Sequence, residues 1–330
     1  MAGLAAVTGG TGFLGRYVVT ALAASGWRVR LLARRPPAHP QLAGVPLEVV
    51  SGDLANRSAL STLVDGADII IHAAGLIKAS STAQFQAVNA EGTAHLASTI
   101  SEVNPRARVL LVSSLAAREP ELSAYAETKR AGEQRLREIL GHGTDWTIVR
   151  PGVIYGPWDR ETLAIFKAAA LRIVPRPRVA GARIALIHAS DAAAAIVTLA
   201  TNGPSRAVLE LADERVEGYT WSEIISAAEA ALSRRLIGLE VPAPILRTVA
   251  ALNLAAGWLM HRPPMLTPGK VREMLHADWG STLDRQPARE LWRPSIGLAR
   301  GLRDTLSWYK DRHSLPANEM RPGARASSSN

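Results

Sequence analysis

The sequence predicts a doubly wound α/β fold, in which helices cover both faces of a parallel sheet. Short apolar runs alternate with helical patterns through the first half of the chain, and the connections between them are short. This alternation is typical of parallel strands joined by right-handed crossovers. A glycine-rich turn follows the first apolar run, at positions 8–15. Because ligands of such sheets bind beyond the carboxyl ends of the strands, we expect the functional residues there.

Apolar runs mark the strands, and helical patterns lie between them. The expected strands are 4–7, 28–33, 47–51, 68–73, 108–113 and 145–150, and the expected helices are 16–25, 58–64, 83–103 and 125–140. After Pro151 this alternation fades. One more strand is expected at 184–187, and Ser190 or Asp191 is expected to cap the alanine-rich helix that follows. Further helices are expected at 221–234, 243–260 and 267–276.

The glycine turn has the spacing G-x-x-G-x-x-G, from Gly9 through Gly12 to Gly15. Gly9 permits a tight turn, Gly12 lets backbone N–H groups approach phosphates, and Gly15 lets the helix pack close to the sheet. The helix that starts here presents unpaired N–H donors and a partial positive charge to an anion. The turn therefore predicts a site for the pyrophosphate of a dinucleotide.

The same patterns divide the chain into parts of unequal size. Residues 1–155 are expected to form the dinucleotide-binding domain, to which a strand and a helix at about 183–202 are added. Residues 156–182 and 203–312 are expected to form a smaller, mainly helical lobe over the cofactor site. Proline, glycine, arginine and serine at 313–330 predict a disordered tail.

Composition excludes several classes of protein. The 330 residues include no cysteine, which excludes disulfides and thiolate chemistry and fits a reducing cytosol. No apolar run reaches the roughly 18 residues of a spanning helix, and no secretory signal is visible. The net charge of +9 is read either as arginine spread over solvated faces or as attraction to an anion. Without zinc-finger spacing, a basic helix or an RNP-type segment, we expect no nucleic-acid partner, and without a cluster of metal-ligand spacing we expect no metal.

A serine, a tyrosine and a lysine form a candidate catalytic set. Ser113 and Ser114 follow the expected strand 108–113, and Tyr125 and Lys129 lie four residues apart on the next helix, so that they share a face. The phenol has an ordinary pKa of about 10, which a nearby ammonium group lowers. A serine hydroxyl at the strand end could hold the reacting oxygen in place.

Together these motifs resemble the short-chain dehydrogenase/reductase superfamily, in its extended or atypical branch that includes the NAD-dependent epimerase/dehydratase family. The resemblance covers residues 4 to about 200. It also rests on four further signatures: Gly-Asp-Leu at 52–54, His-Ala-Ala-Gly at 72–75, Val-Asn-Ala-Glu-Gly-Thr at 88–93 and Arg-Pro-Gly-Val-Ile-Tyr-Gly-Pro at 150–157. It implies that Tyr125 is the acid/base, that Lys129 tunes it and binds the nicotinamide ribose, and that Ser114 polarises the substrate oxygen. Ser114 matches the family position better than Ser113, which still belongs to the strand. Asn89 is either a proton relay or a polar contact that stabilises its helix.

The resemblance also implies a set of cofactor contacts along the strand ends. They are Gly9, Thr11, Gly12, Phe13, Leu14, Gly15, Asp53, Leu54, Ala73, Ala74, Gly75, Lys129 and Pro151. Where an NAD-specific enzyme has an acidic residue after the second strand, this chain has Arg34 and Arg35. Guanidinium groups suit a 2′-phosphate, so we expect NADP(H) in preference to NAD(H). A solvated basic turn is the other interpretation of this pair.

Three functions are compatible with these motifs. The expected one is hydride transfer between NADP(H) and a ketone or secondary alcohol of an apolar, lipid-, sterol- or quinone-like molecule. The others are a nucleotide-sugar epimerase that retains NAD and a non-catalytic NADPH-binding scaffold or sensor. Leu-Ala-Ala at 115–117 lacks the acidic pair of the family's dehydratases, and no acidic residue follows the second strand as in its epimerases. The 146–151 run is similar to complex I accessory-subunit-like members, and the 301–310 segment to 3-beta-hydroxysteroid-dehydrogenase-like members, which suggests an apolar substrate.

Further features of the chain leave alternatives open. Apolar residues recur at helical spacing through 245–262, which predicts either a helix buried in the lobe or a helix at a membrane surface. We therefore expect a cytoplasmic protein that is either soluble or membrane-associated. Homodimerisation through 83–103 and 125–140 is implied by the resemblance alone. Tyr155, Trp158 and Phe166 are either substrate contacts or aromatic core, and His188 is best explained as a packed residue beside a helix cap.

Overall fold

The computed structural model describes residues 3–159, 161, 172–260 and 266–311, and of 257–260 it describes only the backbone. Its centre is a seven-stranded sheet in the order β11-β6-β5-β4-β1-β2-β3, with every neighbouring pair parallel. The strands are β1 Leu4–Thr8, β2 Arg28–Ala33, β3 Leu47–Ser51, β4 Ile69–His72, β5 Arg108–Val112, β6 Trp146–Pro151 and β11 Ala207–Leu211. The predicted tail at 313–330 and Phe166 lie outside the described residues.

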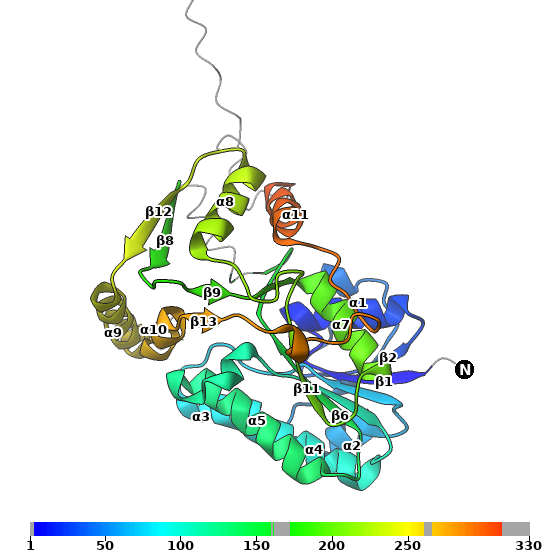
Figure 1. Ribbon diagram of the computed structural model, residues 1–330. Coiled ribbons are helices and arrows are strands. Elements are labelled where there is room, and N and C mark those ends of the chain that lie inside the picture. The colour runs from blue at the N-terminus through cyan, green and yellow to red at the C-terminus, as the bar shows by residue number, and fades with distance from the viewer. Residues whose placement is uncertain (1–2, 160, 162–171, 261–265, 312–330) are drawn as a thin grey trace, which may run out of the picture.

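Helices cover both faces of this sheet, as Figure 1 shows. On one face lie α1 (Phe13–Ala24), which packs on β1 and β2, and α7 (Ala189–Asn202), which packs on β4, β5 and β6. On the other lie α2 (Arg57–Val64), α4 (Gly92–Val103) and α5 (Ala124–Leu140). Each face buries its own apolar cluster, because the strands are apolar on both sides. The doubly wound fold predicted from the sequence is confirmed.

The seventh strand of the sheet comes from a different segment than the sequence predicts. Residues 207–211, expected in the lobe, form β11 and pair with β6, so that Leu211 lies opposite Pro151. The expected strand 184–187 instead splits into β9 (Arg183–Ile184) and β10 (Leu186–His188), which pair with short strands outside the main sheet. The partner of β10 is β7 (Val153–Tyr155). The expected division at 183–202 and 203–312 is therefore wrong for these strands, because pairing partners are set by tertiary contacts.

The lobe combines helices with small parallel pairs of strands. The strand β8 (Ile173–Pro177) pairs with β12 (Ile237–Val241), and β13 (Asp278–Trp279) pairs with β9. The helices are α8 (Trp221–Leu232), α9 (Ala243–Met260), α10 (Pro268–Leu275) and α11 (Leu298–Asp311). A capping box between Thr220 and Glu223 starts α8, and Thr267 caps α10 with Pro268 in its first turn. Among the described residues no helix is both long and apolar enough to cross a bilayer.

Two helix starts differ from the sequence expectation. The single helix expected at 83–103 is a short helix α3 (Thr82–Phe85), a π-helical turn η2 (Gln86–Glu91) and α4. The cap of α7 is His188, whose Nδ1 accepts from the Ser190 N–H at 3.3 Å, and neither Ser190 nor Asp191. The Asp191 carboxylate instead accepts hydrogen bonds from the 295–296 segment. The prediction that Ser190 or Asp191 caps α7 is therefore wrong.

Candidate active site

The glycine turn between β1 and α1 forms an open cradle of backbone N–H groups. Gly9 has φ +73°, and a Cβ there would lie 2.4 Å from the Ala74 nitrogen, so that only glycine fits. A Cβ on Gly15 would lie 2.1 Å from the Gly9 carbonyl oxygen, which shows how closely the helix approaches the turn. The N-cap of α1 is Gly12, and no side chain caps it. The first N–H groups of α1 are therefore open to an anion, as a dinucleotide pyrophosphate requires.

The ends of β2 and β3 open beside this turn. Thr8 lies opposite Leu32, and Ala33 lies opposite Ser51, so the chain leaves β1, β2 and β3 at one edge of the sheet. The residues that follow β2 are Arg34 and Arg35, and both are exposed. Beyond β3, the Asp53 carboxylate accepts from the Ala55 N–H at 2.9 Å, while its side chain stays exposed. Leu54 packs where a Cβ on Gly92 would lie.

The end of β4 is held by a buried polar chain. His72 Nδ1 lies 2.6 Å from Thr8 Oγ1, and its Nε2 lies 3.0 Å from Thr93 Oγ1. Burial, with the nearby Lys129 ammonium group, lowers the pKa of His72 to about 3, so the ring is neutral. These hydrogen bonds fix the end of β4, after which residues 73–75 follow.

Asn89, in the π-helical turn, connects that segment to α5. Its side chain donates to the Leu76 carbonyl oxygen and to Thr128 Oγ1, and accepts from the Leu76 N–H at 2.8 Å. Gly132 lets α5 come close, because a Cβ there would lie 2.4 Å from the Asn89 carbonyl oxygen. The π-turn thus lies where α4 and α5 meet the loop after β4. Of the two interpretations left open for Asn89, these contacts favour the stabilising one.

Tyr125, Lys129 and Ser114 meet at the end of β5. The Ser114 hydroxyl hydrogen-bonds the Tyr125 phenol, and Ser114 Oγ also accepts from the Ala116 N–H at 3.2 Å. Lys129 is 8% exposed, and its ammonium group donates to the Val112 carbonyl oxygen at 2.7 Å. A Cβ on Gly75 would lie 3.6 Å from Lys129 Nζ, which places this ammonium group beside the loop after β4. The three predicted residues are therefore brought to one strand edge.

Burial controls the protonation of this cluster. It raises the pKa of Tyr125 to about 12, although the Ser114 hydrogen bond acts in the opposite direction. It lowers the pKa of Lys129 to about 8, although the Glu133 carboxylate favours the charged form. The sequence predicts a phenol pKa lowered by lysine, whereas in the structure desolvation of the phenolate is the largest effect and the Ser114 hydrogen bond, not the Lys129 charge, acts against it. At neutral pH the phenol keeps its proton.

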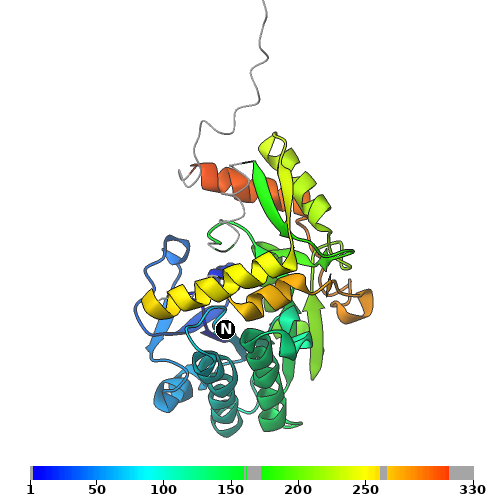
Figure 2. The same cartoon turned by 90° about the vertical axis from the view of Figure 1, so that its left-hand side faces the viewer.

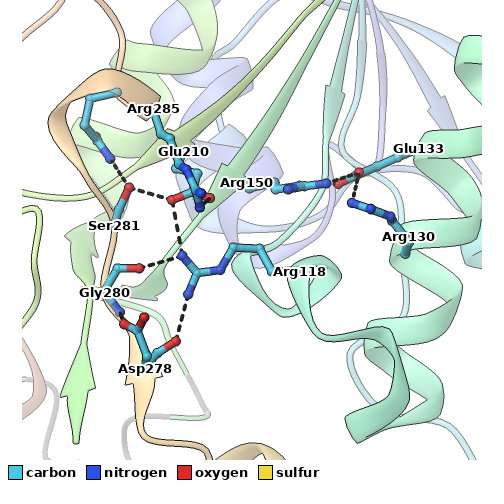
Figure 3. Close-up of polar contacts among 10 residues, drawn as sticks. Arg118, Arg130, Glu133, Arg150, Glu210, Asp278, Gly280, Ser281 and Arg285 are labelled. Carbon is cyan, nitrogen blue, oxygen red and sulfur yellow. Dashed lines mark hydrogen bonds and ion pairs between the residues drawn. The ribbon is translucent and has the colours of Figure 1, made fainter. Parts of the chain in front are cut away.

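A buried carboxylate that the sequence analysis misses lies behind the cluster. Glu133 is fully buried and accepts from the Ser113 hydroxyl at 2.5 Å. It also binds the Arg150 guanidinium at 2.8 and 2.6 Å, as Figure 3 shows. Since Ser113 is engaged in this contact, Ser114 is the serine that faces the phenol. Glu133 follows Tyr125 and Lys129 at four-residue spacing, so helical periodicity could have found it.

The lobe contributes a second carboxylate that the sequence did not indicate. Ser123 caps α5, and its hydroxyl hydrogen-bonds the buried Glu273 carboxylate of α10. The Glu273 charge raises the pKa of Tyr125 further. The Arg272 guanidinium also donates to the Leu122 carbonyl oxygen at 2.7 Å. The N-terminus of α5 is thus bound to the lobe by a contact across 150 residues of sequence, which no local pattern reveals.

Other predicted positions lie around this centre. Pro151 ends β6 and is buried, at the same edge as Ser114. Trp158 packs against His39 and Trp308, with ring centroids 4.4 and 4.6 Å apart. Tyr155 is 2% exposed, which favours the core interpretation for that residue. The described residues contain no group of three or more potential metal ligands.

Comparisons with known proteins agree with this arrangement. The family model "NAD dependent epimerase/dehydratase family" matches residues 5–212. The chain is 43% identical over 316 residues to a ceramide reductase of Caulobacter vibrioides, covering 96% of this chain and 97% of the relative. It is 26% identical to the 40 kDa subunit of mitochondrial NADH-ubiquinone oxidoreductase of Neurospora crassa, over 82% and 70% of the two chains.

A solved structure shares the fold. The dTDP-glucose 4,6-dehydratase of Bacillus anthracis, determined in complex with NAD, aligns over 96% of this chain and all of that chain with a TM-score of 0.70 and 15% identity. The glycine turn leaves room for backbone to approach an anion, and the strand edge carries the tyrosine, lysine and serine that the resemblance implies. Together with the match over residues 5–212, these features show that the chain belongs to the NAD-dependent epimerase/dehydratase family of oxidoreductases.

Proposed function

We propose that this protein is an NADP(H)-dependent reductase that converts a ketone on a long-chain, ceramide-like lipid to a secondary alcohol. The observation that carries the proposal is the contact between the Ser114 hydroxyl and the protonated Tyr125 phenol at the strand edge that also holds Lys129. The 43% identity with a ceramide reductase over nearly the whole of both chains supports the substrate class.

The proposed chemistry divides between the cofactor and the protein. A bound nicotinamide supplies a hydride to the carbonyl carbon. The Tyr125 phenol donates its proton to the carbonyl oxygen, and its pKa of about 12 keeps that proton available at neutral pH. The Ser114 hydroxyl orients the same oxygen. The Lys129 ammonium group, anchored on the Val112 carbonyl, favours the phenolate left after transfer.

NADP(H) is the proposed cofactor because of the chain that follows β2. Arg34 and Arg35 are exposed beside the glycine turn, and no acidic residue stands at that strand end. Two guanidinium groups can bind a 2′-phosphate, whereas the ribose hydroxyl of NAD gives them no charge to pair with. Arg34→Asp is expected to weaken NADPH binding at least about tenfold more than NADH binding. Equal weakening in a fluorescence titration would remove the phosphate role of Arg34.

The main test measures NADPH consumption with the ketone form of a short-chain ceramide. Tyr125→Phe is expected to lower kcat by about two to four orders of magnitude and to leave the NADPH Kd unchanged, because only the proton donor is lost. Tyr155→Phe is the matched control, since the Tyr155 hydroxyl is buried and bonds no atom of the described residues. A Tyr125→Phe variant as active as the control would overturn the assignment. Wild-type protein that binds NADPH but reduces no ketone would favour the alternative function, a non-catalytic NADPH-binding scaffold or sensor.

A further inference from the structure

The lobe exposes a concentration of apolar side chains on one side of the molecule. Seven of the twelve large apolar residues that are exposed in the described chain lie on β8, β12 and α9. Six of them define what we call the lobe surface: Ile173, Ile237, Leu239, Ile245, Val249 and Leu252, each 45–66% exposed. A monomer rarely leaves so many large apolar side chains in water on adjoining elements without a partner.

Both parts of the lobe surface are built by regular structure. In the β8–β12 pair Ile237 lies opposite Ile173, and Leu239 two residues on points to the same face, while Val174 of β8 points inward. In α9, positions 245, 249 and 252 follow helical spacing and form one stripe. Figure 2 shows α9 (yellow) lying along the side of the molecule turned to the viewer, with α10 (orange) beside it. That side is the left of Figure 1, where β8 and β12 also lie.

Charge around the lobe surface has one predominant sign. The segment 234–276 contains six arginines or lysines and two glutamates. Within α9 the single charged residue is Arg247, which is exposed but lies two residues from Ile245, roughly 200° around the helix and so away from the apolar stripe. Arg235, just before β12, is exposed as well. Apolar side chains bordered by cations match the headgroup region of an anionic bilayer, where the chains enter and the cations meet lipid phosphates.

The lobe surface is also coupled to the candidate active site. The helix α9 packs against α10, and α10 holds the start of α5 through the contact of Glu273 with Ser123. Tyr125 is two residues from that cap. A bilayer seated on α9 would therefore lie beside the helix that carries the proposed proton donor.

We propose that the lobe surface docks the protein on an anionic lipid bilayer, from which its lipid substrate enters. The docking extends the proposed function, because a long-chain substrate resides in the bilayer and its transfer through water would be costly. Binding itself can be measured without catalysis, so the two proposals fail separately.

The experiment is flotation of the full chain with vesicles of phosphatidylcholine alone or of equal parts phosphatidylcholine and phosphatidylglycerol. We expect the wild-type protein to float with the anionic vesicles. Leu252→Asp removes an inserting side chain and adds a repelled charge, and is expected to lower binding at least about tenfold. Leu283→Asp is the matched control, because Leu283 is 63% exposed and Leu252 is 66% exposed. Arg235→Gln is expected to weaken binding about fivefold on anionic vesicles and little on neutral ones.

Companion measurements distinguish bilayer docking from self-association of the chain. Leu252→Asp is expected to keep wild-type turnover of a water-dispersed short-chain ketone and to lose turnover of a long-chain ketone held in vesicles. Equal flotation of Leu252→Asp and Leu283→Asp would overturn the proposal, as would a wild-type protein that stays at the bottom of the gradient. Light scattering that shows a dimer which Leu252→Asp converts to a monomer, with no vesicle binding, would assign the surface to a second copy of the chain instead.

Discussion

Two buried glutamates, Glu133 and Glu210, form ion pairs in different parts of the molecule, and they differ in which elements they connect. Glu133 and Glu210 each accept a 2.5 Å hydrogen bond from a serine. Each also pairs with two arginines, and Figure 3 shows both carboxylates with the arginines around them. Glu133 joins α5 to β5 and β6 within the sheet domain. Glu210, on β11, joins the sheet to Arg118 and to the lobe residues Ser281 and Arg285. The first pairing stabilises one domain, and the second fastens two parts of the chain.

The two sites also differ in whether their arginines have other hydrogen-bond acceptors or solvent contact besides the glutamate carboxylate. Arg150 is 11% exposed and bonds Glu133 through two nitrogens. Arg118 is 12% exposed, but it also donates to the Gly280 and Asp278 carbonyl oxygens at 2.7 Å each. Arg285 is 53% exposed and 3.4 Å from Glu210. Loss of Glu133 therefore leaves a buried cation without its partner, whereas loss of Glu210 does not.

The largest effect is expected from Glu133→Ala. It leaves the buried Arg150 guanidinium without its hydrogen-bonded carboxylate and frees the Ser113 hydroxyl, and should lower the free energy of unfolding by about 3–5 kcal/mol. Urea unfolding followed by circular dichroism measures it. A loss below about 1 kcal/mol would mean that Arg150 finds another partner.

A smaller loss is expected from Glu210→Ala, on the order of 1–3 kcal/mol, because Arg118 keeps its two carbonyl acceptors. The junction between sheet and lobe should loosen, so the KM for the ketone is expected to rise more than the KM for NADPH. Steady-state kinetics at both substrates provides the measurement. If Glu210→Ala destabilised the protein more than Glu133→Ala, the distinction between the two sites would be wrong.

A third buried carboxylate, three residues after Glu210, forms no ion pair with any residue that the structure describes. Asp213 accepts from the Tyr219 hydroxyl at 2.8 Å and from the Arg215 backbone N–H at 3.0 Å, and burial raises its pKa to about 6. A raised carboxyl pKa favours the folded state at low pH, and this stabilisation is lost as the pH rises through about 6.

Asp213→Asn is accordingly expected to stabilise the fold by about 1 kcal/mol at pH 8 and to change little at pH 4. Thermal unfolding at both pH values is the test. The opposite order would show that Asp213 stays ionised in the folded protein.

Local patterns predicted much of this molecule. The bounds of β2, β3 and α9 agree with the strands and helix expected at 28–33, 47–51 and 243–260, because these segments have clear periodicity and marked ends. The glycine turn and the tyrosine–lysine spacing are also local, so Gly9, Tyr125 and Lys129 could be placed on the right elements. The π-turn was not predicted, since it depends on how closely Gly132 lets α5 approach.

Contacts between distant segments could not be predicted from one sequence. Ser123 meets Glu273 across 150 residues, and Arg118 meets Gly280 across 162. Nothing in the local spacing of a glutamate tells which serine or arginine it will meet. The same holds for β11, whose sequence is equally suited to a strand of the lobe. Sequence thus placed Ser114, Tyr125 and Lys129 near one strand edge, whereas the carboxylates that contact their neighbours were visible only in the structure.

The position of β11 at the edge of the sheet has a consequence for how the protein is made. Six strands of the sheet are complete once residue 151 has been synthesised, but β6 pairs on its outer side with residues 207–211. During synthesis the edge of β6 therefore carries unpaired backbone groups until more than fifty further residues have been added to the chain. Exposed strand edges invite pairing with other chains. During that interval the growing polypeptide is most open to aggregation and to chaperone binding.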